Sequence, residues 1–144
     1  MTESKILLNG IDEGINTSIS SIVCGSESPQ LVLKSIQHIF PDFATPDGID
    51  DPTFGNPSNY KFKQENVPLN NFLTMIRQQA ILDTALDVLS MNLDDNTTSF
   101  QILRQAAIAG KVAFNLTEQN PLGGVIEITL SGDDLETWIE AATW

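Results

Sequence analysis

The residue types that could form a nucleophile are scarce in this chain, which holds one cysteine, Cys24, and one histidine, His38. A Cys–His pair would therefore have to use these two residues. The helical periodicity described below places Cys24 at a helix C-terminus, where the negative end of the dipole disfavours a thiolate. The same periodicity puts His38 near the end of a second helix, where an imidazolium is stabilised. We therefore expect a small buried cysteine and a surface histidine rather than a nucleophilic pair.

Carboxylates that could bind a hard cation gather at Asp47, Asp50 and Asp51, with Asp42 nearby. Calcium takes several such oxygen ligands from a flexible loop. The spacing is not that of an EF-hand, and no glutamate follows at the position that closes such a loop. A solvated turn is the favoured interpretation. A zinc site would need more histidine or cysteine ligands than the chain holds, so we expect no metal and no other cofactor.

Phosphate binding is disfavoured by both motif and charge. Gly123 and Gly124 precede a predicted strand rather than a helix N-terminus, and no Walker-type motif occurs. The chain has 7 Lys and Arg against 19 Asp and Glu, a formal net charge of −12. So few bases cannot form a broad phosphate-binding face, which argues against direct contact with nucleic acid or an anionic membrane. The sequence shows neither a signal peptide nor a run of ~20 apolar residues, so the expected location is the cytoplasm.

An acidic and aromatic surface is predicted near the C-terminus. No Lys or Arg follows Lys111, and Glu136 and Glu140 lie one helical turn apart on the last predicted helix. Trp138 and Trp144 lie beside them, and exposed aromatic rings with a polar surround are typical of protein-docking surfaces. The alternative, left open by the sequence, is that Trp138 belongs to the core and Trp144 to a fraying end.

The periodicity of the apolar residues predicts the elements that must position these side chains. An apolar stripe from Ile11 to Val23, at steps of three and four, predicts a helix that ends near Gly25. Alternating apolar residues near the C-terminus predict two strands joined as a β-hairpin. The complete expectation is a strand at 5–9, helices at 11–23, 29–40, 68–91, 97–109 and 132–143, and hairpin strands at 112–116 and 126–130.

Residues 41–67 follow none of these regular patterns, and ordered loops of this length are usually functional. Aromatic residues are spread through the segment, which predicts a packed loop with a short strand at 60–63. Such a loop could act as a lid over a small ligand. The residues it would bring to that ligand are His38, Asp42, Asp47, Tyr60 and Arg77.

We expect a single domain over residues 1–144, of the α+β class, with about five helices packed on a small antiparallel sheet containing a β-hairpin near the C-terminus. No set of residues converges on a chemical reaction, so we expect a soluble, non-catalytic protein-interaction or assembly module. Its partner would be another protein or a second copy of the chain. One alternative is an acidic inhibitor that mimics the charge of nucleic acid. Another is a small-ligand-binding domain with 41–67 as its lid.

Overall fold

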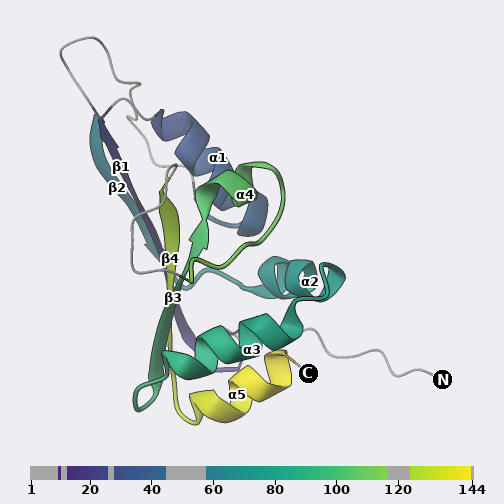
Figure 1. Cartoon of the computed structure of the whole chain (residues 1–144). Coiled ribbons are helices and arrows are strands. Elements are labelled where there is room, and N and C mark those ends of the chain that lie inside the picture. The colour runs from purple at the N-terminus through teal and green to yellow at the C-terminus, as the bar shows by residue number, and fades with distance from the viewer. Residues whose placement is uncertain (1–9, 11–12, 26–27, 45–57, 117–123, 144) are drawn as a thin grey trace.

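The computed structural model describes residue 10 and residues 13–25, 28–44, 58–116 and 124–143. Within these residues a four-stranded antiparallel sheet carries five helices, all on the same side of the sheet (Figure 1). This confirms the expected α+β class. The strands are β1 (Asn16–Gly25), β2 (Ser58–Glu65), β3 (Thr97–Leu103) and β4 (Val125–Ser131). The helices are α1 (Pro29–Ile39), α2 (Asn70–Gln78), α3 (Leu82–Met91), α4 (Arg104–Ile108) and α5 (Leu135–Ala142).

The strand order β2-β1-β4-β3 places the first described strand in the middle of the sheet, next to the last one. Each neighbouring pair is antiparallel. The residue pairs continue from one strand to the next: Lys63 pairs with Ser20, Ser20 with Glu127, and Glu127 with Gln101. These four residues therefore form one row across the sheet.

Alternation along the strands gives the sheet two different faces. The covered face points at the helices and carries the fully buried Ile19 and Val23 of β1. The residues between these point the other way, onto what we call the open face. The open face is lined by Ser18, Ser20 and Ile22 of β1, Lys61, Lys63 and Glu65 of β2, Thr97, Ser99, Gln101 and Leu103 of β3, and Val125, Glu127, Thr129 and Ser131 of β4.

The helix predicted at 11–23 is wrong, because residues 16–25 form the strand β1. Ile15, Ile19 and Val23 recur every four residues, and a step of four also returns to the same face of a strand. All three are buried on the covered face. Ile22 distinguishes the two periods, because a residue three positions after Ile19 lies on the same side of a helix but on the opposite face of a strand. It is 60% exposed on the open face. The β-branched and Ser/Thr-rich composition also fits a strand better than a helix.

The helix predicted at 97–109 is also wrong over most of its length. Thr98, Phe100 and Ile102 are buried at every second position, which is the period of β3. Only the last part is helical, as the short α4. The alternation that predicted the strand at 126–130 is confirmed by β4.

The partner of β4 differs from the predicted hairpin. β4 pairs with β3 and β1, so an antiparallel pair near the C-terminus is present, but its first strand is 97–103 rather than 112–116. The segment 112–116 contributes an isolated bridge between Phe114 and Ile102. It lies along the outer edge of β3, where Asn115 N donates to Gln101 O at 2.8 Å.

The long helix predicted at 68–91 is divided into α2 and α3 by a left-handed turn at Ala80, where φ is 59°. Ala80 N donates to Arg77 O at 3.1 Å and Ile81 N donates to Ile76 O at 3.0 Å. These two bonds are those of a Schellman C-cap. The break lets each helix turn its own apolar stripe toward the core, which explains why the combined sequence is apolar almost all round.

Two other helices follow the sequence closely. α1 begins after Ser28, whose Oγ accepts a hydrogen bond from Leu31 N at 3.4 Å, with Pro29 as the first helical residue. α5 lies within the last predicted helix, 132–143, and buries Leu135 and Ile139 against the core. In Figure 1, α1 and α4 cover the upper half of the sheet, α3 and α5 the lower half, and α2 lies between them.

An aromatic cluster joins these layers. Phe72 of α2 lies with its ring centroid 5.8 Å from that of Phe40 and 5.7 Å from that of Phe100. Phe114 completes the group at 5.8 Å from Phe100. Such offset and tilted ring contacts add specificity to the burial of apolar area, so this cluster fixes α2 against β3.

Candidate functional site

The predicted ligand-binding residues lie on separate elements. His38 of α1 is within 2.9 Å of the carbonyl oxygen of Ala107, measured from Nδ1. Since a carbonyl only accepts, Nδ1 carries the proton in this contact, and the ring joins α1 to α4. Arg77 lies in the last turn of α2 and is partly exposed. Asp42 is exposed beyond the end of α1.

Two further members of that set are less fully placed. Tyr60 lies in β2, so the short strand predicted at 60–63 is confirmed and extends over Ser58–Glu65. Asp47 and the other residues of 45–57, the middle of the predicted lid, lie outside the described residues. Neither of the two hollows described below is lined by any of the five candidates. The ligand-binding lid therefore stays a prediction.

The predicted docking residues of the C-terminus divide into buried and exposed members. Trp138 is 7% exposed, and its indole Nε1 donates to Glu13 Oε1 at 3.0 Å, so this ring belongs to the core. The structure thus supports the alternative left open by the sequence for this residue. Glu136 and Glu140 are exposed on α5, while Trp144 lies outside the described residues.

Exposed carboxylates gather at one end of the molecule. α3 and α5 pack side by side there (Figure 1), and the described helices and turns of this end contain neither Lys nor Arg. Like charges at this density repel one another and any similarly charged molecule. The carboxylates are those of Asp83, Asp87, Asp94, Asp95, Asp133, Asp134, Glu136 and Glu140.

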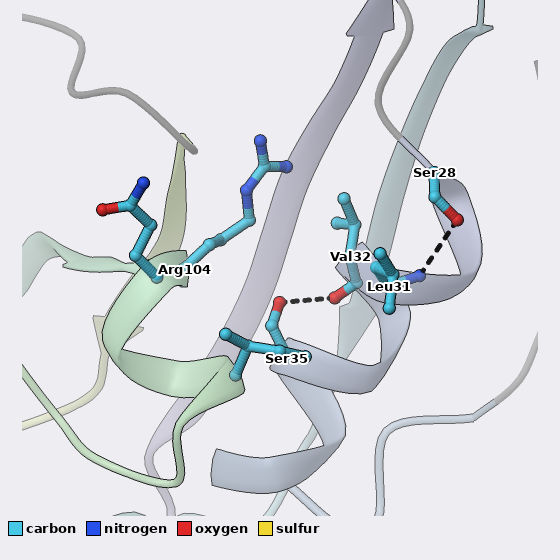
Figure 2. Close-up of a pocket in the computed structure, with 7 residues that line it drawn as sticks. Ser28, Leu31, Val32, Ser35 and Arg104 are labelled. Atoms are coloured by element: carbon cyan, nitrogen blue, oxygen red, sulfur yellow. Dashed lines mark hydrogen bonds between the residues drawn. The ribbon is translucent and has the colours of Figure 1, made fainter.

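A hollow of about 230 Å³ lies between α1 and α4 (Figure 2). Its lining is mainly apolar, and Leu31 is 59% exposed at its rim. The polar groups of α1 at this hollow are already engaged: Ser28 Oγ caps the helix and Ser35 Oγ donates to Val32 O at 2.6 Å. The lining consists of Ser28, Leu31, Val32, Ser35, Arg104, Gln105 and Ile108.

Arg104 closes the floor of this hollow and is the one arginine among the buried residues of the described chain, at 5% exposure. Its Nη1 donates to Ser21 Oγ at 3.0 Å and to Ile22 O at 2.7 Å. Ser21 Oγ in turn donates to Val125 O at 2.7 Å. The pairing of β1 with β4 ends at Ser20, so the guanidinium fills the gap where the two strands separate. These contacts give Arg104 a structural role.

A second hollow, of about 540 Å³, lies along the outer edge of β3. It is bounded by Met91 at the end of α3 and by Leu116, which are 73% and 66% exposed. Three residues of the open face also reach it: Ser99, Gln101 and Glu127. The last two make contact with each other. Their side chains are joined by a long contact of 3.5 Å from Gln101 Nε2 to Glu127 Oε2.

The open face differs from the rest of the surface in its charge. Lys61 and Lys63 of β2 and Glu65 and Glu127 lie on it, so its formal charges balance while the whole chain carries −12. Ile22 is 60% exposed near one end of this face. Single exposed apolar residues are ordinary, but here Val125 and Leu103 lie half-buried at the same end. The open face is therefore the surface of the described residues that best combines apolar and balanced charged groups.

Sequence reasoning missed Arg104, Lys63 and Glu127. Arg104 was hidden because its partner Ser21 lies 83 residues away and was assigned to a helix. Lys63 and Glu127 each alternate with buried residues, Phe62 and Ile128, which signals an outward-facing strand position. That signal predicts their exposure, but only the strand order brings the two residues into one row.

The described part of the chain holds no group of three or more His, Cys, Asp or Glu side chains arranged to bind a metal ion. None of its helices is long and apolar enough to cross a membrane.

Comparison with known proteins gives relatives by fold and by sequence. No family model matches the chain. A UPF0201 protein of Sulfurisphaera tokodaii is 29% identical over 119 residues, which are 82% of this chain and 79% of that protein. The crystal structure of a UPF0201 protein from Methanococcus jannaschii superposes with a TM-score of 0.71 at 24% identity, covering 90% of this chain and 99% of that one.

Two more solved structures share the arrangement. A second UPF0201 protein gives a TM-score of 0.66 at 22% identity, over 83% of this chain and 84% of that one. A DUF54 protein from Methanothermobacter thermautotrophicus gives 0.57 at 19% identity, over 89% and 91% of the two chains. These likenesses show the fold, and the names of the relatives state no activity.

Proposed function

We propose that this protein is a non-catalytic assembly module that associates with copies of itself. The observation that carries the proposal is the open face of the sheet. All five helices of the described chain lie on the other side, and Ile22 stands 60% exposed on the open face. A sheet packed on one face is stable with its other face in water, but such a face is then usually polar throughout.

The rest of the described surface is less suited to self-association. At the end formed by α3 and α5, carboxylates without basic neighbours would repel a second copy. The hollow between α1 and α4 is small, at about 230 Å³, and its Ser28, Ser35 and Arg104 side chains have partners within the chain. The open face has balanced charges and an exposed apolar residue, Ile22, near one end, which favours association between identical chains.

Sedimentation equilibrium and native mass spectrometry over a range of protein concentrations test this proposal. We expect a reversible oligomer whose smallest unit is twice the 15.7 kDa chain mass. Closed two-fold dimers are the commonest homo-oligomers, so the dimer is the expected unit. A chain that stays monomeric up to the millimolar range would contradict the proposal.

The charge-mimic alternative keeps one supporting observation, the carboxylates gathered over α3 and α5. It predicts binding to a basic protein that weakens steeply as salt is added. Self-association through the open face predicts a weaker salt dependence, because apolar contact contributes as well as charge. Measuring both oligomerisation and binding to a basic protein at low and high salt therefore separates the two functions.

A further inference from the structure

The charges of the open face are arranged in a pattern that a second copy can complement. In the row described above, Lys63 and Glu127 lie on either side of Ser20, each one strand away. Neighbouring strands are about 4.8 Å apart, so the two opposite charges are symmetrically placed about β1. Any operation that exchanges the two sides of β1 therefore places each charge against its opposite.

A two-fold axis lying in the interface and running along β1 performs this exchange. It lays β1 on β1 of the second copy and β2 on β4 of the second copy, at the same level along the strands. Lys63 then faces Glu127 of the second copy, and Glu127 faces its Lys63. Two equal ion pairs result, as required for a self-complementary interface.

Two other two-fold arrangements of the same face bring like charges together. An axis across the strands at the level of Ser20 would place Lys63 on Lys63 and Glu127 on Glu127 of the second copy. An axis along β4 would also oppose the two Glu127 side chains. Like charges facing each other across an interface are unfavourable, so of these three arrangements the axis along β1 is the one that opposes Lys63 and Glu127.

The residues of β1 itself fit this arrangement. The axis would place Ile22, which is 60% exposed, directly on Ile22 of the second copy. Ser18 and Ser20 are small, so two sheets could approach to the ordinary face-to-face distance of about 10 Å. The contact would bring the two Ile22 side chains together on the axis, with the ion pairs on both sides of the axis two residues away, at the level of Ser20.

We infer that the open face binds the open face of a second copy, with the two-fold axis along β1, Ile22 on Ile22, and Lys63 paired with Glu127 of the second copy. This inference rests on the proposed self-association and adds its geometry. It names a surface away from the acidic end of α3 and α5, so the −12 charge of the chain does not prevent the contact.

A charge-swap experiment tests the geometry. The variants Lys63→Glu, Glu127→Lys and the double variant are compared by sedimentation equilibrium with the unchanged chain. Each single reversal opposes like charges at both symmetric positions, and we expect the dimer dissociation constant to rise at least about ten-fold. The double variant restores both pairs in exchanged positions, and its dissociation constant should return to within about three-fold of the original.

Matched controls have the same change of charge elsewhere. Lys34→Glu on α1 and Glu140→Lys on α5 change exposed residues away from the open face and should leave the dissociation constant within about two-fold. Ile22→Gln gives an independent measurement that does not depend on charge, and it too should weaken the dimer at least about ten-fold. Thermal unfolding checks that each variant keeps its fold, which the exposure of all these side chains favours.

The outcomes separate the geometry from the proposed function. A dimer that is insensitive to Lys63→Glu, Glu127→Lys and Ile22→Gln would overturn the interface while leaving self-association intact. Single reversals that weaken the dimer without rescue in the double variant would overturn the axis along β1. A monomeric unchanged chain would refute both the proposed function and this inference.

Discussion

The guanidinium of Arg104 donates a hydrogen bond to the main-chain oxygen of Ile22, with 2.7 Å between Nη1 and O. This contact joins the first residue of α4 to the middle of β1, at the point where β1 and β4 cease to pair. The same side chain is the buried cation of the described core and also touches Ser21 Oγ. Where β1 and β4 separate, the side chain of Arg104 therefore joins them in place of backbone hydrogen bonds between the two strands.

Replacing Arg104 with methionine should destabilise the fold markedly. Methionine keeps much of the volume but leaves Ser21 Oγ and Ile22 O without this donor, and buried groups that lose a charged partner are costly. We expect the free energy of unfolding to fall by about 2–3 kcal/mol, measured by urea unfolding followed by circular dichroism. Lys111→Met, on an exposed side chain, is the control and should change it by less than about 0.5 kcal/mol. An equally small loss in Arg104→Met would contradict the structural role of Arg104.

Gly124 is the second residue that this arrangement requires. Its φ is +76°, and a Cβ at this position would collide with the guanidinium of Arg104. Gly124→Ala should therefore lower the free energy of unfolding by about 3 kcal/mol, from backbone strain together with the collision. Gly110 is a matched control, because its φ is +79° and nothing lies within 4 Å of an added Cβ. Gly110→Ala should cost only the strain, about 1 kcal/mol.

A double-mutant cycle checks that the extra cost at Gly124 comes from Arg104. In the Arg104→Met background, Gly124→Ala should cost about as much as Gly110→Ala, because the flexible methionine can move away. An unchanged penalty in that background would mean that another neighbour of Gly124 causes it.

Ala80 offers a change in the stabilising direction. It is exposed, has a φ of 59°, and occupies the position after the C-cap of α2 that glycine usually takes. Ala80→Gly should raise the free energy of unfolding by about 1 kcal/mol, because glycine adopts this conformation without strain. Ala141→Gly, at an exposed position inside α5, should lower it by about 0.5–1 kcal/mol. If both substitutions lower the free energy of unfolding equally, glycine relieves no backbone strain at Ala80.

The elements that could be predicted from the sequence are those with an unambiguous period or a clear start. α1 follows Ser28-Pro29, which marks a helix N-terminus, and β4 shows strict alternation of buried Ile126, Ile128 and Leu130. β1 could not be assigned correctly, because Ile15, Ile19 and Val23 satisfy the helical and the extended periods together. The deciding residue, Ile22, reads as part of a helical stripe until the structure shows it exposed.

The candidate sites could be predicted less well from the sequence than the fold, because they depend on which strands become neighbours. Lys63 and Glu127 lie far apart in the chain and meet in one row only through the order β2-β1-β4. The local pattern correctly gave Glu136 and Glu140 as exposed on one helix face. It could not decide whether Trp138 was buried, because burial depends on contacts with distant parts of the chain, such as its hydrogen bond to Glu13, 125 residues away.

Glu136 and Glu140 test whether the dipole of α5 affects the stability contributed by carboxylates at its two ends. Glu136 lies in the first turn of the helix, where the positive end of the dipole stabilises a carboxylate, and Glu140 lies in the last turn, where the negative end does not. Neutralising them should therefore have opposite effects: Glu136→Gln should lower the thermal midpoint and Glu140→Gln should raise it. Both shifts should shrink in 1 M sodium chloride, where the Debye length falls to about 3 Å. Shifts of the same sign at low salt would show that repulsion from the carboxylates of α3, rather than the dipole of α5, dominates the electrostatics of this end of the molecule.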